Sequence, residues 1–283
     1  MNDITFVIFT YNEEKRIERI IKNVKNYGKI LLNDDHSTDN TREIALSYGC
    51  EILLRVKNYD FAEHPEMAAS IYEKITTEWL FWMYADEMLD ERTLTKIDSI
   101  IKLQSSKYDI IKIYRKNYFY GAFCYDLYQS ANNRIFKKGA IDFTDNVIHG
   151  FGKEVVPTKR VYNLPDKYFI HQFIDYTASS YLNKMDVYTK TELKSEKNAK
   201  KSVWYFLFKI AKNLIRNYFF DKGYIAGFPA LSLTELTLFY ELIKNIKIYE
   251  QENFLTKQSI EEKNDIHRDF ILNQMENNCI SNL

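Results

Sequence analysis

Residues 4–17 read ITFVIFTYNEEKRI, a continuous apolar run followed at once by polar residues. A short apolar run without alternation is typical of a strand that is buried on both faces. Capping residues follow at 10–12, and apolar residues then recur at helical spacing over 17–24. The stretch therefore predicts a strand followed by a helix, which is the repeating unit of an α/β sheet.

The same unit recurs along the first hundred residues. Strand patterns are found at 30–32, 52–56 and 79–85, and helical patterns follow each of them, the last over 91–103. This alternation predicts an α/β fold, Rossmann-like, with a mainly parallel sheet and helices on both faces. Patterns at 109–114 and 129–136 predict antiparallel strands, and from about residue 175 the chain is predicted to form a C-terminal helical subdomain.

Composition excludes several classes of protein. Lys+Arg and Asp+Glu both number 39 in the 283 residues, and this balance argues against a nucleic-acid binder that relies on a basic surface. Three widely spaced cysteines argue against a disulfide framework and favour a reducing compartment. The N-terminal apolar run is too short for a signal peptide, and no apolar run is long enough to span a membrane, so we expect a cytoplasmic protein.

Three strand ends carry clusters of polar residues. They are Thr10–Glu13, Asn33–Ser37 and Tyr84–Glu87. A single Asp before a helix is most often only an N-cap. Because the carboxyl ends of parallel strands meet at one edge of a sheet, where ligands bind, we expect these three clusters to form a common site.

The segments FTYNEEKRI, LLNDDHSTDNT and WMYADEML, in this order and spacing, resemble the family 2 glycosyltransferases, which have the GT-A fold. The resemblance is strong over 4–100. A weaker one continues through RIFKK, VIHG and FIHQ, and the stretch from 181 to 231 is similar to the branch of bacterial lipopolysaccharide-core β-glucosyltransferases.

The resemblance implies a division into three segments. Residues 1–104 form the nucleotide-sugar-binding half of the GT-A domain, and residues 105–174 form its acceptor-side half. Residues 175–283 form the helical extension.

The resemblance also implies a nucleotide-sugar donor, with UDP as the expected nucleotide. Thr10, Tyr11 and Glu13 would line the nucleotide pocket, and Asp34 would accept a hydrogen bond from the base, since desolvated base N–H groups need acceptors. The segment Tyr84-Ala85-Asp86 stands at the position of the family's DxD motif, so all three residues would contact the nucleotide sugar. Asp86 matches the last Asp of that motif, which holds Mn²⁺ or Mg²⁺ on the diphosphate.

Tyr84 departs from the family pattern, because it stands where the first Asp of DxD is found. This departure puts the affinity for the metal in doubt. Glu87 either restores that affinity in place of the missing Asp, or is a solvent-facing or helix-capping carboxylate. His171 falls where GT-A enzymes often place a histidine ligand of the metal, although a lone histidine is more often a packed or surface residue. Arg134 is a candidate partner for a phosphate group of the donor; alternatively, it is a surface residue of a strand.

The general base is expected near residue 150. Inversion by direct displacement needs a group that takes the acceptor's proton. The related branch has a His-Glu pair where this chain has His149-Gly150, so Asp145 and His149 are the candidates.

Residues 203–220 are aromatic and basic. Their apolar side predicts either core for the helical subdomain, or contact with an anionic membrane at its inner face, or a site for a polyanionic acceptor. A membrane contact would suit a lipid-linked acceptor.

The function predicted is therefore that of an inverting, metal-dependent glycosyltransferase with a glycan or lipid-linked acceptor. The alternatives are a nucleotide-sugar-binding protein without turnover, and transfer to a protein or to modified DNA. A nucleotidyltransferase is disfavoured because TYNEEKR lacks the glycines of a triphosphate-binding loop.

Overall fold

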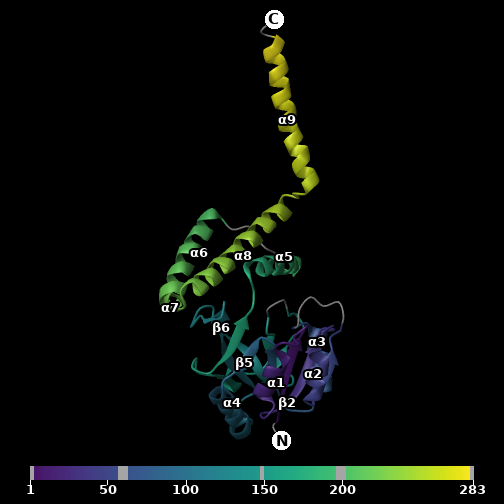
Figure 1. Ribbon diagram of the computed structural model, residues 1–283, viewed down its shortest axis with the longest axis vertical. Coiled ribbons are helices and arrows are strands. Elements are labelled where there is room, and N and C mark those ends of the chain that lie inside the picture. Colours follow the sequence, from purple (N-terminus) through teal and green to yellow (C-terminus); the bar gives the residue numbers. More distant parts are fainter. Residues whose placement is uncertain (1–2, 57–62, 147–149, 196–201, 281–283) are drawn as a thin grey trace.

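The computed structural model describes residues 3–56, 63–146, 150–195 and 202–280 (Figure 1). Strands and helices alternate over the first hundred residues, as the apolar pattern predicts. Their bounds are β1 Ile4–Thr10, α1 Ile17–Val24, β2 Lys29–Asp34, α2 Thr41–Ser47, β3 Glu51–Leu54, α3 Pro65–Lys74, β4 Trp79–Tyr84, β5 Glu87–Leu89 and α4 Glu91–Gln104.

The middle of the chain is mainly strand. The elements are β6 Ile110–Phe119, β7 Ala122–Phe123, β8 Ser130–Lys137, β9 Ile141–Asp142, β10 Lys153–Glu154, a short 3-10 helix at Thr158–Arg160, β11 Val161–Asn163 and β12 Phe169–Ile174. The main sheet has the order β3-β2-β1-β4-β8-β6-β12-β5. Strands β1 to β4 pair in parallel, whereas β8 runs antiparallel to both β4 and β6. The strands after residue 105 therefore continue the sheet that the first hundred residues begin.

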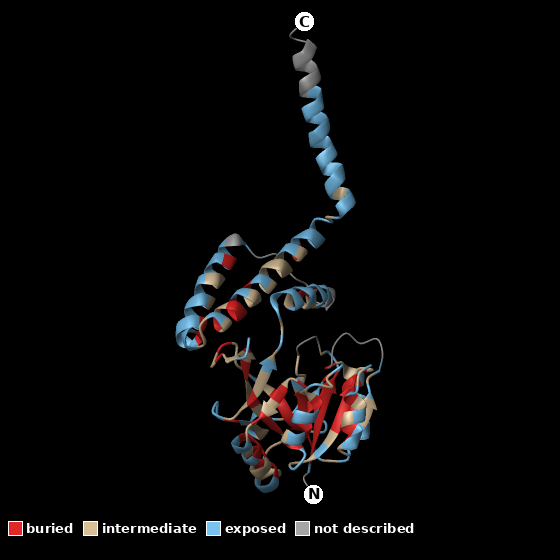
Figure 2. Cartoon of the chain, in the orientation of Figure 1, coloured by how far each residue is buried: buried red, intermediate tan, exposed pale blue. Residues whose placement is uncertain are grey.

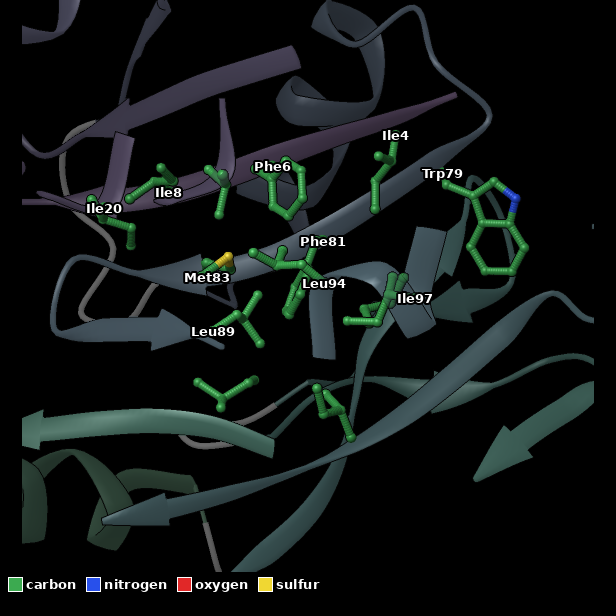
Figure 3. Packing of buried hydrophobic residues seen from close by; sticks show 14 of the residues in the cluster. Ile4, Phe6, Ile8, Ile20, Trp79, Phe81, Met83, Leu89, Leu94 and Ile97 are labelled. Atoms are coloured by element: carbon green, nitrogen blue, oxygen red, sulfur yellow. The ribbon is translucent and has the colours of Figure 1, made fainter. Parts of the chain in front are cut away.

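The sheet has a hydrophobic core on each face, because successive side chains of a strand point to opposite sides. On one face, Phe6 and Ile8 of β1 pack with Phe81 of β4 against α1 and α4 (Figure 3). On the other face, Val7 and Trp82 pack against α3 and the segment around Phe143. Figure 2 shows that the buried residues are concentrated in this α/β part of the molecule.

The C-terminal part is helical, as predicted from residue 175 onward. It contains α5 Ala178–Ser195, α6 Val203–Ile215, a π-helical turn Arg216–Phe220, α7 Gly223–Ala226, α8 Phe228–Glu252 and α9 Lys257–Ile280. Helix α8 packs on α5 and α6, and α9 extends away from the body of the molecule (Figure 1). The predicted fold class, a GT-A type sheet followed by a helical subdomain, is confirmed; the exact domain boundaries stay a prediction.

Candidate active site

A cleft of about 910 Å³ opens between the edge of the sheet and the C-terminal helices. Its floor is formed by the ends of β1, β2 and β4 together with β6, β8 and β12, and its roof by α5 and α8. Strand β1 lies between β2 and β4, with Thr10 opposite Asp34 and Phe9 opposite Tyr84. The three polar strand ends therefore lie at one edge of the sheet, as the α/β pattern predicts.

Asp86 lies in the turn between β4 and β5 and lines this cleft. Its Oδ2 accepts a hydrogen bond of 3.0 Å from Gln172 Nε2. Burial, together with the negative charge of Glu87, raises the pKa of Asp86 to about 6, although Gln172, Arg115 and Arg16 act in the opposite direction. A carboxylate held with so little compensation is well placed to gain from a cation in the cleft.

Glu87 and Arg134 form a buried ion pair beneath this turn. The Arg134 guanidinium binds both carboxylate oxygens of Glu87, and its Nε donates to the carbonyl oxygen of Trp82 at 2.6 Å. Neither side chain lines the cleft. Arg134 is therefore neither a phosphate partner nor a surface residue, and Glu87 is neither a metal ligand nor a solvent-facing or capping carboxylate, because each one neutralises the other inside the protein.

Tyr84 holds the same turn in place. Its backbone N–H donates to Glu87 at 3.0 Å, and its hydroxyl donates to the buried Glu63. The guanidinium of Arg134 stacks 5.0 Å from the Tyr84 ring. Where the family pattern has a first carboxylate, this chain has a ring that lines the cleft and packs over the buried ion pair.

Asp34 is fully buried and does not line the cleft. It accepts hydrogen bonds from Thr10 Oγ1 at 3.0 Å and from the N–H and hydroxyl of Ser37 at 2.9 and 2.5 Å. These hydrogen bonds tie the end of β1 to the loop after β2, so the structure does not offer Asp34 to a base. Its neighbour Asp35 lines the cleft, where Arg55 contacts it at 3.0 Å.

The other residues predicted for the nucleotide pocket do lie at the cleft. Thr10, Tyr11, Glu13 and Ala85 all line it. Tyr11 is 59% exposed, whereas Glu13 is half-buried and pairs with Arg16, whose Nη1 in turn reaches Asp175 at 2.9 Å. Burial raises the pKa of Glu13 even though Arg16 opposes that shift.

His171 faces away from Asp86. It lies on β12 beside Gln172, and adjacent residues of a strand point to opposite faces. Gln172 takes the face toward Asp86; the His171 ring packs between Phe169 and Tyr118, with Nδ1 at 3.0 Å from the Tyr118 hydroxyl. Burial lowers the pKa of His171. His171 therefore does not line the cleft in this structure, and its role as a metal ligand stays a prediction.

The two candidate bases have different outcomes. Asp145 lies in an exposed turn after β9 and is not among the residues that line the cleft. It therefore has no contact with the site in this structure. His149 lies outside the described residues, so its role stays a prediction.

Sequence reasoning missed Arg115, Gln172 and Lys184, which line the cleft, and it expected Asp35 there only as a member of the cluster Asn33–Ser37. Period-2 alternation places Asn33 and Asp34 on opposite faces of β2, and, continued one residue past the strand, it places Asp35 on the side of Asn33, which is a signal available in the sequence. Nothing local marks Lys184, because its place depends on how α5 packs over the sheet.

The donor set at Asp86 fits a divalent cation that also takes oxygen atoms from a bound substrate. Among the described residues, no three His, Cys, Asp or Glu side chains are grouped so that they could hold a metal by themselves. Mg²⁺ and similar hard cations commonly bind through one or two carboxylates and the phosphates of a substrate. One carboxylate, with the Gln172 amide beside it, is compatible with that mode.

Comparison with known families identifies the class of protein that this site and fold define. Residues 5–152 match the model of glycosyl transferase family 2, and the chain belongs to that family. The prediction of a glycosyltransferase is thus confirmed at the level of the family, whereas the lipopolysaccharide-core branch is not tested by this match.

Curated relatives match part of the chain. A prophage-derived glycosyltransferase of Bacillus subtilis, SunS, is 28% identical over 103 residues, which are 35% of this chain and 24% of the relative. An uncharacterized glycosyltransferase of Rickettsia typhi is 31% identical over 106 residues, which are 35% of this chain and 33% of that relative. These matches span a third or less of the relatives' own length.

Solved structures with a similar arrangement include TarS of S. aureus in complex with UDP-GlcNAc. It is 15% identical, with a TM-score of 0.44 over 70% of this chain and 68% of the solved TarS fragment, residues 1–349. The mannosyltransferase PcManGT of Pyrobaculum calidifontis, in complex with GDP-Man and Mn²⁺, is 13% identical, with a TM-score of 0.47 over 86% and 87% of the two chains.

Proposed function

We propose that this protein transfers a sugar from a nucleotide-diphosphate donor, with UDP as the expected nucleotide, to an acceptor bound under the helical roof. The observation that carries the proposal is the poorly compensated Asp86 carboxylate at a cleft that joins three strand ends of a family 2 chain. The resemblance to lipopolysaccharide-core β-glucosyltransferases favours a hexosyl donor and a saccharide acceptor of the cell envelope.

The position of the donor follows from the strand order. From Asp35 after β2, across β1, to Asp86 after β4 is two strand spacings, or roughly 10 Å at about 4.8 Å each. This distance is comparable with the reach of a nucleoside diphosphate from base to terminal phosphate. We place the base beside Asp35 and Tyr11 and the diphosphate beside Asp86, so that Asp35 takes the role first assigned to Asp34.

A divalent ion, Mn²⁺ or Mg²⁺, is proposed to bind at Asp86. When bound there it would neutralise the charge that develops on the leaving diphosphate. The chain's own residues have supporting roles: Gln172 orients the Asp86 carboxylate, and the guanidinium of Arg115, which lines the same part of the cleft, balances phosphate charge. PcManGT carries Mn²⁺ in its complex with GDP-Man, which is consistent with this proposal.

Inversion is proposed to proceed by direct attack of an acceptor hydroxyl on the anomeric carbon. The hydroxyl loses its proton to a base while the bond from the sugar to the diphosphate breaks. His149 remains the proposed base, and Asp145 is not proposed again because it lies outside the cleft lining.

The experiment that tests this function is release of UDP from UDP-glucose and UDP-GlcNAc, with and without Mn²⁺. We expect Mn²⁺-dependent release that falls by about 10²–10³-fold in Asp86→Ala, the usual loss when a group that stabilises transition-state charge is removed. Asp98→Asn is the matched control, since Asp98 lies on α4 and pairs with Lys102 away from the cleft. Nucleotide binding without release in the wild type would favour a binding protein without turnover.

We further propose that the protein contacts an anionic membrane surface through an aromatic patch. Within 202–220, Phe206 and Asn217 are the buried side chains among those described, so the segment is not mainly core. The patch is made of exposed side chains of α6, the π-helical turn, α7 and the start of α8, namely Trp204, Tyr205, Leu207, Phe208, Ile215, Phe219, Phe220, Tyr224, Ile225 and Phe228.

The charges around the aromatic patch suit anionic lipids. Residues 202–228 contain four basic residues and one acidic residue, Asp221. Exposed aromatic rings beside Lys and Arg are typical of helices that lie in a membrane interface. Among the described residues, no helix has both the length and the hydropathy needed to cross a bilayer. Sedimentation with phosphatidylglycerol vesicles, compared with phosphatidylcholine vesicles, tests the contact; equal binding to both would contradict the role of charge.

A further inference from the structure

The cleft continues beyond Asp86 into a space under the helical roof. Rings from α5, from α8 and from the segments before β8 and α5 surround it. We call this part the tyrosine chamber and define it by the residues Tyr128, Tyr176, Tyr181, Lys184, Tyr188 and Tyr240. It adjoins the reacting centre, because Asp86 and the residues of the chamber line the same cleft.

The rings of the tyrosine chamber form a surface that suits a saccharide. Tyrosine presents an apolar face and a polar tip, which match the C–H faces and the hydroxyl groups of a sugar ring. Tyr240 is held by a 2.6 Å hydrogen bond to Glu192, and Tyr128 accepts a 3.0 Å hydrogen bond from Asn217. Two of the rings are thus fixed before any ligand binds, which lowers the entropic cost of binding.

Lys184 is the cation of this chamber, and it has no carboxylate partner among the described residues. Its ammonium donates to the Tyr176 hydroxyl and lies 4.3 Å from the centre of the Tyr176 ring and 5.3 Å from that of Tyr188. An ammonium has three N–H donors, and a half-buried charge without a counter-ion is costly.

The acidic residues of the cleft do not form ion pairs with Lys184. Glu13 and Asp175 pair with Arg16, Asp35 pairs with Arg55, and Glu192 pairs with Lys244 at 2.6 Å. Glu63 accepts from Tyr84. Lys184 therefore faces the chamber as a cation whose described partners are neutral phenols.

We propose that the tyrosine chamber is the acceptor subsite and that Lys184 selects saccharide acceptors carrying a phosphate or carboxylate group. The inference rests on the proposed function, since it places the acceptor opposite the donor across Asp86. The anionic group accepts hydrogen bonds from the ammonium of Lys184, and the sugar ring packs on Tyr176 and Tyr188. Lys184 is a specificity residue, and it takes no part in the transfer of the proton.

Calorimetric titration of the full chain, with UDP and Mn²⁺ present, tests the inference with three probes: glucose 6-phosphate, glucuronate and glucose. We expect the two anionic probes to bind about tenfold or more tightly than glucose, in line with one charge-assisted contact. Lys184→Met should remove that preference. Lys190→Met is the matched control, because Lys190 lies on the exposed side of α5 and pairs with Asp186 at 2.6 Å.

Three results would overturn the inference: equal binding of charged and neutral probes, an unchanged preference in Lys184→Met, or probe binding that occurs without UDP and is lost when UDP is present, which would place the probes in the donor half. Tyr188→Leu provides a second variant and should weaken all three probes together. Binding of UDP is measured separately in each protein. If UDP itself does not bind, the proposed function is contradicted. If UDP binds normally and the probes show no preference, only the assignment of the tyrosine chamber as acceptor subsite is contradicted.

Discussion

The α/β part and the C-terminal helices of this protein place their aromatic residues in opposite environments. In the sheet, Trp79, Phe81 and Trp82 are buried in the two cores. In the helical part, Trp204 is 80% exposed and Phe220 is 76% exposed. The colours of Figure 2 follow the same division, with buried residues concentrated around the sheet and exposed ones along α6 and α9.

The difference shows that apolar content alone does not indicate what a segment is for. The rings of β4 stabilise the fold that holds Asp86 in position, because they are buried away from water. The rings of Trp204, Tyr205 and Phe208 in α6 remain exposed to water, and large exposed apolar patches mark interaction sites.

The largest effect is expected beneath the sheet edge, at the buried pair Glu87 and Arg134. Glu87→Gln leaves the Arg134 charge without its partner in a fully buried position. Breaking a buried ion pair by removing one member costs about 3–5 kcal/mol, and urea unfolding should show a loss of that size.

The double variant Glu87→Leu/Arg134→Met separates charge from packing. It removes both charges and should recover much of the lost stability, because an apolar pair avoids the penalty of a lone buried charge. Equal stability of Glu87→Gln and wild type would mean that the pair is not buried as described.

On the helical side, the test is to remove the rings of the aromatic patch. Exchange of Trp204, Phe208, Phe219 and Phe220 for serine should lower binding to phosphatidylglycerol vesicles by about tenfold or more, since each large side chain contributes up to about 1.5–3 kcal/mol when it leaves water. The unfolding midpoint of the sheet should hardly change, because these side chains are exposed.

Leu103→Ser is the control for exposure alone. Leu103 is 80% exposed on α4, far from the aromatic patch in sequence, and its loss should leave vesicle binding unchanged. If all five substitutions affect binding alike, exposure and not the aromatic patch governs the contact.

The two faces of β12 provide a smaller test. Gln172→Ala removes the hydrogen bond to Asp86 and should reduce Mn²⁺-dependent UDP release by about tenfold, the value of one hydrogen bond to a charged group. His171→Ala should leave the Mn²⁺ concentration needed for half-maximal release unchanged, because the ring lies among Tyr118, Phe169 and Phe173. A large rise in that concentration for His171→Ala would restore His171 as a ligand.

Much of the sheet is predictable from the sequence, because strands buried on both faces need continuous apolar runs. The runs at 4–9 and 79–85 become β1 and β4, and the polar residues after them reach a common edge. That edge follows from the topology of parallel strands and requires no knowledge of side-chain contacts. The positions of Thr10, Tyr11 and Asp86 at the cleft were predictable for this reason.

What could not be predicted depends on pairing over long distances in the chain. Arg134 is buried because β8 lies beside β4, which brings it to Glu87. His171 and Gln172 are adjacent polar residues, and the pairing of β12 with β5 decides which of them meets Asp86. Lys184 enters the site through the packing of α5 over the sheet, and no local pattern contains that information.

The smallest effect concerns the contact that joins α5 and α8 above the cleft. Lys247 of α8 contacts Asp186 of α5 at 2.7 Å, and hydrogen bonds from Lys190 and Lys247 lower the pKa of Asp186 to about 2. A carboxylate whose pKa is lower in the folded state stabilises that state above its ordinary pKa of 3.8, and the contribution is lost as the pH falls toward 2.

Because both side chains are near the surface, salt should screen the pair, and its contribution should be small. Asp186→Asn should therefore lower the thermal midpoint slightly at pH 7 and low salt, and the difference from wild type should vanish near pH 2 or in high salt. A difference that persists at both extremes would show that Asp186 acts through packing and not through its charge.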